Sequence, residues 1–280
     1  MRYVSFLFLL FLPFLLHPKI LTDFKNPDSV LVDEETGYIY VSNINGSPVA
    51  RDDNGFISRI SPDLQTVTLR YLDGALNEFE LNAPKGMAIK NGMLYVADID
   101  VIRGFDLKER INVQNIHLSP YGAKYLNDLV FTPDGKLLAT DTVYNAIFQI
   151  EIGKGIRVKI LFHSPLLKNP TGISCSPKGI VYFLSATGSN IWEYCGGTIK
   201  KKLGERTYYR YLEDLNLDGE GNIYFTDFLL GKIFRLGKEG RLSTFPGNFY
   251  SPTSIYIDSK RKRMFIVESS VNRVQVIDLE

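Results

Sequence analysis

The stretch LNDLVFTPDGKLLATD, residues 126–141, has the pattern of a β-hairpin. Two short apolar runs flank a Pro-Asp-Gly turn at 133–135. Runs that alternate with a period of two are typical of strands, and a tight turn between two such runs predicts a hairpin. Asn127 and Asp128 precede the first run, which raises the question whether they belong to a binding site or only cap a strand.

Five further segments align with this hairpin. Each begins with Pro or Leu and a variable polar residue, followed by an apolar run, a Gly-rich or charged turn, and a second run rich in aliphatic and aromatic residues. The segments are PDSVLVDEETGYIYVSN from Pro27, PKGMAIKNGMLYVAD from Pro84, PTGISCSPKGIVYFLSA from Pro170, LEDLNLDGEGNIYFTD from Leu212 and PTSIYIDSKRKRMFIVE from Pro252. The variable polar residues lie 40 to 57 positions apart, so the chain is an internal repeat.

The repeat predicts a six-bladed β-propeller. A third strand follows every hairpin and a fourth follows the first five, which gives the four strands of a propeller blade. No stretch after Leu16 keeps a helical period, so the fold class is all-β. The sixth unit has only three strands before Glu280, and we expect the segment KILTDF at 19–24 to complete it and close the ring.

The first residues have the layout of a signal peptide. Arg2 precedes an apolar stretch over 3–16, which is shorter than the about 20 residues of a membrane-spanning helix. No small-x-small triplet precedes His17, so an uncleaved N-terminal membrane anchor is the alternative. We therefore divide the chain into a signal peptide or anchor over 1–18 and a propeller over 19–280, exported to the periplasm or the extracellular space.

Composition argues against several functions. The 32 basic and 31 acidic side chains balance, so no overall field favours nucleic acid. The three histidines lie away from the starts of the first strands, which disfavours a histidine-dependent lactonase or zinc site. Cys175 and Cys195 fall on the first and third strands of one blade, too far apart for a disulfide, and are expected to be buried. We expect a monomer, since a closed ring hides its edges without a partner.

The repeats resemble those of a known family. GMAIKNGMLYVAD and LNLDGEGNIYFTD look like NHL-type propeller repeats, and everything after residue 18 resembles the gluconolactonase and regucalcin (senescence marker protein) group of six-bladed propellers. YVSNINGSPVARDDNGFISRISPD, followed by LNAPKGMAIKNGMLYVADID, is similar to a bacterial exported branch of that group. The resemblance is specific for the fold and says less about function, because propellers carry many unrelated activities.

The resemblance implies a divalent metal, usually calcium, on the ring axis. Asp28, Asn127 and Glu213 match the family's ligand positions, and Glu213 also matches its catalytic Asp. Two positions depart from the family, since Thr171 replaces an Asn and Lys85 adds a positive charge. The six axial residues, each second in its first strand, are Asp28, Lys85, Asn127, Thr171, Glu213 and Thr253.

The same site can be argued from the residues alone. Equivalent positions of the first strands face one mouth, and two carboxylates with an amide oxygen suit a hard cation such as calcium, completed by waters. Such an ion could polarise a lactone carbonyl, with Glu213 as general base. Asp128 or Asp214 could serve after a one-residue shift of register. The alternative is that these side chains only bond backbone amides at strand starts.

A second polar series ends the second strands on the same face. Its repetition argues for a turn role, in which the Asp members accept backbone hydrogen bonds from the following turn and line a pocket only secondarily. The series is Asn43, Asp98, Asp141, Asp227 and Glu268. In blade one, the loop NINGSPVARDDNG at 43–55 lies on this face and is a candidate lid or binding loop.

Two functions remain. The departures at Thr171 and Lys85 slightly favour an exported propeller that binds a small molecule, glycan or protein at its axial mouth. Its ligand contacts would be Lys85, Asp128, Thr171, Asp214, Thr253, Asn43 and Asp98. The alternative is a divalent-metal-dependent lactone or ester hydrolase that uses Asp28, Asn127 and Glu213, with the metal, most simply calcium, as its cofactor.

Overall fold

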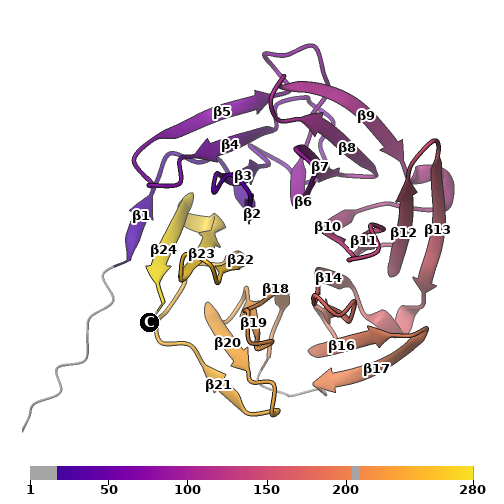
Figure 1. Cartoon of the computed structure of the whole chain (residues 1–280), viewed down its shortest axis with the longest axis vertical. Helices are drawn as coiled ribbons and strands as arrows, with labels where there is room; N and C mark the ends of the chain where they lie inside the picture. The colour runs from indigo at the N-terminus through magenta and orange to yellow at the C-terminus, as the bar shows by residue number, and fades with distance from the viewer. Residues whose placement is uncertain (1–17, 204–208, 280) are drawn as a thin grey trace, which may run out of the picture.

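The computed structural model describes residues 18–203 and 209–279, whose strands form six four-stranded sheets around one axis (Figure 1). The predicted six-bladed β-propeller is confirmed. In blades one to five the strands follow one another outward from the axis in chain order. The signal-peptide prediction falls on 1–18, of which 1–17 lie outside the described residues. Within the described part, no helix has the length and apolarity needed to span a bilayer.

The blades contain the following strands, given from the axis outward. Blades one and two are β2 (Pro27–Val32), β3 (Ile39–Asn43), β4 (Phe56–Ile60) and β5 (Val67–Asp73), then β6 (Pro84–Lys90), β7 (Met93–Asp98), β8 (Val101–Asp106) and β9 (Ile111–His117). Blades three and four are β10 (Leu126–Phe131), β11 (Leu137–Asp141), β12 (Ala146–Ile152) and β13 (Ile156–His163), then β14 (Pro170–Cys175), β15 (Val181–Ser185), β16 (Asn190–Cys195) and β17 (Thr198–Leu203). Blades five and six are β18 (Leu212–Leu217), β19 (Ile223–Asp227), β20 (Lys232–Leu236) and β21 (Leu242–Thr244), then β22 (Pro252–Asp258), β23 (Arg263–Glu268), β24 (Arg273–Asp278) and β1 (Lys19–Leu21). The helical segments among the described residues are three single 3₁₀ turns, η1 (Ser119–Tyr121), η2 (Pro165–Leu167) and η3 (Ser269–Val271).

The N-terminal strand closes the ring as expected. β1 pairs antiparallel with β24, with Lys19 opposite Val276 and Leu21 opposite Val274. Leu21 is buried in a hydrophobic cluster with Val30 of β2 and Phe265 of β23. The first and last parts of the chain therefore share one sheet and one core (Figure 1).

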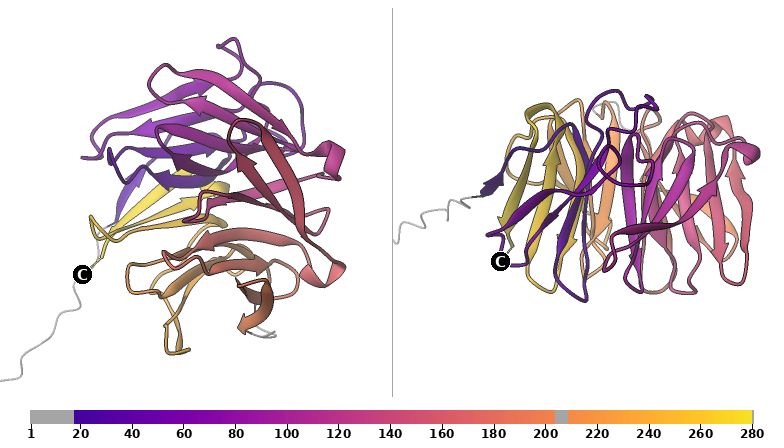
Figure 2. Two further views of the ribbon diagram at one scale, coloured as in Figure 1. Left: turned by 45° about the vertical axis from the view of Figure 1, so that its right-hand side comes forward. Right: turned by 90° about the horizontal axis from the view of Figure 1, so that it is seen from above.

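Every first strand carries a β-bulge near its start. The register of the first and second strands shifts between Pro27 and Val30 in blade one, and at the equivalent place in each other blade. A bulge inserts an extra residue and re-aims side chains, so the second and third residues of a first strand can both face the axis. Figure 2 shows the strands standing along the axis, which places the six bulges in one layer.

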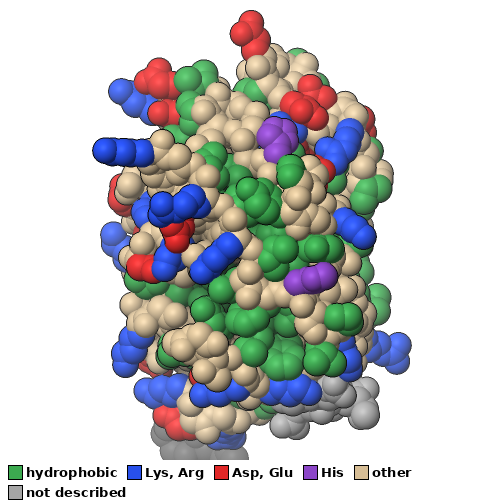
Figure 3. Space-filling view, turned by 90° about the vertical axis from the view of Figure 1, so that its right-hand side faces the viewer, with side chains coloured by type: hydrophobic (Ala, Val, Ile, Leu, Met, Phe, Trp, Pro, Cys, Tyr) green, Lys and Arg blue, Asp and Glu red, His purple; other side chains and the backbone are tan. Residues whose placement is uncertain are grey.

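The histidine and cysteine side chains of the described residues lie away from the axial cavity of the second residues. His117 and His163 end β9 and β13 and are exposed, in line with the expectation, and Figure 3 shows histidine side chains on the outer surface of the ring. Both cysteines are free, as predicted. The expected burial of Cys195 is wrong, because it ends β16 beside the exposed Gly196 turn.

Candidate functional site

The structure brings four of the six axial residues around one small cavity. Asp28, Asn127, Glu213 and Thr253 line a space of about 10 Å³, which holds about one water-sized occupant. The Asn127 side-chain amide donates to a Glu213 carboxylate oxygen at 3.4 Å. Because of the bulges, the residues that follow in the chain, Ser29, Asp128, Asp214 and Ser254, line the same cavity. The second and third residues of the first strands therefore both reach the cavity.

Lys85 points away from this cavity and toward the loop of blade one. Its side chain is fully buried, and Nζ donates to the carbonyl oxygens of Pro48 and Ala83, each at 3.1 Å. The ammonium also lies 4.3 Å from the centre of the Tyr125 ring. The loop at 44–55, which we call the lid loop, thus covers Lys85 at the face where the first strands begin, hereafter the start face.

The two axial threonines join neighbouring blades. Thr171 is fully buried, and its hydroxyl donates to the Leu212 carbonyl oxygen of the next blade at 3.0 Å. The Thr253 hydroxyl donates to the Pro27 carbonyl oxygen at 3.5 Å across the closing seam of the ring. Thr171 does not line either axial cavity, so its role in this structure is a bond between blades.

The axial carboxyl groups have strongly raised pKa values. Burial deep in the ring raises the pKa of Asp28 to about 7, although Lys85 opposes the shift. Burial and the neighbouring Asp28 raise the pKa of Glu213 to about 8. Burial raises the pKa of Asp214 to about 6 and, with Asp214 beside it, that of Asp128 well above its usual range. The axis is therefore a place where negative charge is costly and a proton or cation is favoured.

Asp128 and Asp214 also hold the inner strands together. One oxygen of Asp128 accepts the Ile173 amide of the next blade at 2.9 Å, and one oxygen of Asp214 accepts the Ile255 amide at 2.9 Å. The glycine of the preceding blade makes room for each carboxylate: a Cβ added to Gly172 would lie 2.6 Å from Asp214, and one added to Gly86 2.3 Å from Asp128. The alternative that side chains at strand starts bond backbone amides therefore holds for Asp128 and Asp214. Both side chains also line the axial cavity.

The polar series at the ends of the second strands is structural. Asp141 and Asp227 are fully buried. Each accepts a hydrogen bond from a backbone N–H in the segment that precedes the first strand of its own blade. Asn43 does the same with the Lys25 N–H at 2.9 Å. Asp98 accepts the Ala83 amide at 2.7 Å and pairs with Arg103. Asn43 and Asp98 do not line either axial cavity. The predicted bonds from the following turn are present for two of the three Asp residues: Tyr144 N–H donates to Asp141 at 2.7 Å and Leu230 N–H donates to Asp227 at 3.0 Å. The same carboxylates also bind the segment before their blade, which the prediction did not include.

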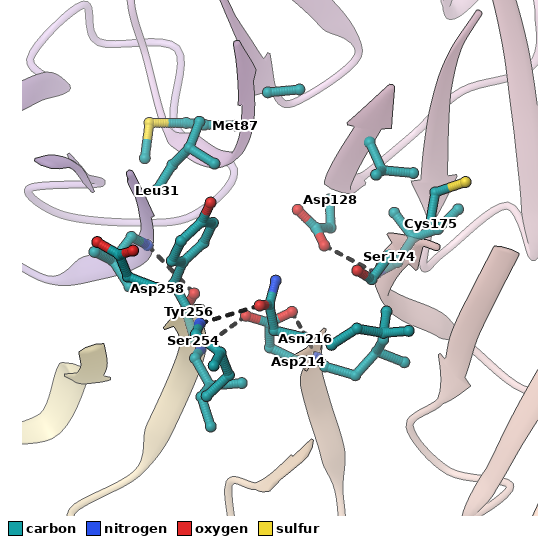
Figure 4. Close-up of a pocket in the computed structure, with 18 of the residues that line it drawn as sticks. Leu31, Met87, Asp128, Ser174, Cys175, Asp214, Asn216, Ser254, Tyr256 and Asp258 are labelled. Carbon is teal, nitrogen blue, oxygen red and sulfur yellow. Dashed lines mark hydrogen bonds between the residues drawn. The ribbon is translucent and has the colours of Figure 1, made fainter. Parts of the chain in front are cut away.

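A larger cavity, which the sequence reasoning missed, opens at the other end of the axis (Figure 4). It has a volume of about 500 Å³ and is lined by the ends of the first strands and the turns that follow them, such as 218–219 and 258–260. We call this face the end face. Asp128 and Asp214 line both cavities and so form the partition between them. The mouth was expected at the start face, where the Lys85 side chain and the lid loop lie instead.

The signal for this cavity was present in the repeat. The fifth residue of each first strand also faces the axis, and two of these residues, Ala88 and Ser174, are small. The full set is Leu31, Ala88, Val130, Ser174, Asn216 and Tyr256. The metal hypothesis compares only the second residues of the first strands, so it does not include this layer of fifth residues.

The axial residues do not present the donor set of a calcium centre. Calcium takes about 6–8 oxygen ligands, and the axial second residues bring only four oxygen-bearing side chains to the cavity, because Lys85 and Thr171 do not line it. A cavity of about 10 Å³ leaves no room for the several waters that would complete the shell. Over the described residues, no group of three or more His, Cys, Asp or Glu side chains is placed to hold a metal ion. The small cavity thus has room for about one water molecule.

Comparison with known proteins identifies the fold. No model of a known protein family matches the chain, and no curated protein matches its sequence. A calcium-binding regucalcin from Agrobacterium tumefaciens is 15% identical over 93% of this chain and 92% of its own, with a TM-score of 0.69. The fold is that of a regucalcin-like six-bladed propeller.

Other solved propellers of the same shape differ in function. A catalytically inactive virginiamycin B lyase from Staphylococcus aureus is 17% identical over 94% of this chain and 99% of its own, with a TM-score of 0.64. An auxiliary nutrient binding protein from Bacteroides thetaiotaomicron is 14% identical over 91% of this chain and 69% of its own, with a TM-score of 0.70. These likenesses establish the architecture, and function must be argued from the site.

Proposed function

We propose that this chain is an exported β-propeller that binds a small molecule in its axial cavity at the end face. The cavity of about 500 Å³ carries the proposal, since it lies in the range of about 300–1,000 Å³ that is typical of small-molecule sites. Apolar and polar side chains share its lining, as in most ligand pockets. Export rests on the N-terminal sequence and is tested by fractionating cells and sequencing the N-terminus of the recovered protein.

The binding proposal is tested by filling the cavity. Ligand-observed NMR with a mixed library of neutral, acidic and basic fragments is run on the wild type and on Val130→Trp, whose side chain would enter the cavity from β10. Ser174→Phe fills it from β14 and covers the case in which the first variant folds poorly. We expect fragments that bind the wild type and neither variant. Fragments that bind all three proteins equally, or none at all, would contradict a site in this cavity.

The alternative, a divalent-metal-dependent lactone or ester hydrolase, uses Asp28, Asn127 and Glu213. What favours it is the convergence of these three side chains on one small cavity. The cavity of about 10 Å³ has little room for the waters that a calcium shell would need, so this function is the second candidate. Metal analysis of purified protein decides: we expect no stoichiometric metal and no change of Tm with calcium or EDTA. Stoichiometric calcium, with lactone turnover lost in Glu213→Gln, would reverse the order.

A further inference from the structure

One layer of the end-face cavity, formed by the fifth residues of the first strands, has two unlike halves. The fifth residues of the first strands in blades one to three are apolar, namely Leu31, Ala88 and Val130. The equivalent residues in blades four to six are polar, namely Ser174, Asn216 and Tyr256. Because the blades follow chain order around the ring, the apolar residues form one half of the wall and the polar residues the other (Figures 1 and 4).

The floor of the cavity accepts hydrogen bonds and carries acid groups. Asp128 and Asp214 are set there by backbone amides: Leu129 and Ile173 donate to Asp128, and Leu215 and Ile255 donate to Asp214. A carboxylate has about four acceptor sites in all, so these two amides leave acceptor capacity on each side chain. Figure 4 shows Asp128 and Asp214 among the side chains that surround the cavity, so this acceptor capacity adjoins the cavity.

Positive charge is scarce along the lining. Lys260, in the turn after β22, is the only basic side chain among the lining residues, against the acids Glu34, Asp128, Asp214, Asp218 and Asp258. Asp258 is neutralised by Arg261 at 3.0 Å, and Glu34 accepts the Tyr256 hydroxyl at 3.3 Å. Lys85, the other cation close to the axis, is turned toward the lid loop at the start face. The two floor carboxyl groups therefore have no cationic partner inside the cavity among the described residues.

We propose that the end-face cavity binds an amphipathic organic cation, whose ammonium group contacts Asp128 and Asp214 while its apolar body packs on blades one to three. Ser174 and Asn216 on the opposite wall supply hydrogen bonds to a polar edge of the same ligand. This inference rests on the proposed small-molecule function and narrows it to one charge class. An anion would lie against the acid groups of the floor, and a neutral ligand would form no charge-assisted hydrogen bond there.

The contacts available at the floor agree with this ligand class. Asp128 and Asp214 both line the cavity, and no cation is paired with either among the described lining residues. A hydrogen bond between an ammonium and a carboxylate is charge-assisted and about twice as strong as a neutral one.

Three matched probes test the charge class on the full chain: 2-phenylethylammonium, 2-phenylethanol and 3-phenylpropionate, titrated at pH 7 by calorimetry. We expect the ammonium to bind at least tenfold more tightly than the other two. Asp214→Asn and Asp128→Asn should each remove this preference, while Asp134→Asn, an exposed acid on the turn of β10, should retain it. Two floor variants are used because either one alone could disturb the bonds between blades, and the melting curve of each is recorded.

The outcomes separate this inference from the function it rests on. Equal binding of the alcohol and the ammonium, with both lost in Val130→Trp, would overturn the cation class and leave a small-molecule site in place. Ammonium binding that survives Val130→Trp and both floor variants would place the contact elsewhere and overturn the inference. Failure of all three probes, when fragments of other classes still distinguish wild type from Val130→Trp, would also overturn it.

Discussion

At the residue scale, the axis of the ring concentrates acid groups that the fold holds close together. Asp28 and Glu213 line the small cavity, and Asp128 and Asp214 separate it from the larger one. Raised pKa values are common both at functional sites and in structural networks, so the shifts alone do not assign a function. They do give a pH dependence of stability that can be measured.

Glu213→Gln should make the protein more stable at pH 8 than the wild type. The pKa of Glu213 is raised to about 8, so the native state holds its proton more tightly than the unfolded chain does. Its stabilising contribution is full below the unfolded value near 4.5 and is lost as the pH rises toward 8. We expect Tm to rise by about 2–4 °C at pH 8, equivalent to about 1 kcal/mol, and to be unchanged at pH 4.

The control is Glu109→Gln, an exposed acid in the turn after β8, which should not change the pH profile. Thermal melts from pH 4 to pH 8 give the comparison. A Glu213→Gln protein that melts below the wild type at pH 8 would indicate a bound cation that the carboxylate holds, and would favour the hydrolase alternative.

Gly172→Ala should destabilise the ring because its Cβ would meet the Asp214 backbone and carboxylate. The added carbon would lie 2.6 Å from the Asp214 Cα, and the contact is with backbone that cannot move aside without shifting β18. We expect a loss of about 1–3 kcal/mol in the free energy of unfolding, measured by urea denaturation. Gly153→Ala, with no atom within 4 Å of the added Cβ, is the matched control, and an equal loss in both would disprove the contact argument.

At the element scale, the bulge in each first strand decides which side chains reach the axis. Without it, alternation would place the second and third residues of a first strand on opposite faces. With it, Asp128 joins Asn127 at one cavity, and Asp214 joins Glu213. The bulges therefore double the density of polar groups on the axis, and they account for its unusual electrostatics.

The lid loop at 44–55 depends on Lys85, so Lys85→Met should loosen it. The variant removes the bond from Nζ to the Pro48 carbonyl, and a hydrogen bond from a charged donor is worth about 1.5–3 kcal/mol. Limited trypsin digestion reports the opening, because Arg51 lies in the loop and is half exposed. We expect cleavage after Arg51 to be roughly tenfold faster. Lys90→Met, at the other end of β6, serves as control, and an unchanged rate at Arg51 in Lys85→Met would refute this role.

At the scale of the whole molecule, the ring is closed by the N-terminal strand β1, which has three residues and pairs with the C-terminal strand β24. β1 covers the outer edge of β24, and Leu21 enters the core between blades six and one. An uncovered edge strand leaves backbone groups open to pairing with other chains. Closure is thus a property of the complete ring rather than of any one blade.

A chain that begins at Thr22 should melt below one that begins at Pro18. The shorter chain lacks the ladder bonds of β1 and the burial of Leu21, which by itself is worth about 1.5–3 kcal/mol. We expect Tm to fall by roughly 4–10 °C and aggregation to increase. Calorimetry and light scattering of the two proteins provide the measurement. Identical melting and dispersity would show that the seam does not need this strand.

Local sequence patterns predict the six blades, their four strands and a closing strand within 19–24, which the structure has at Lys19–Leu21. These features follow from local alternation, turn residues and the need to cover a strand edge, all of which can be read from neighbouring residues. The sequence also selected Asp28, Asn127 and Glu213 as residues that meet on the axis.

Contacts between distant parts of the chain determine which end of the axis is open and which groups the axial side chains bond. The direction of Lys85 depends on Pro48, and the room beside Asp214 depends on Gly172, which are contacts between blades that no local pattern encodes. The end-face cavity arises from the combined sizes of six side chains, one from each blade, from Leu31 to Tyr256. A space left between distant residues is fixed by packing, so it could be seen only once the ring was closed.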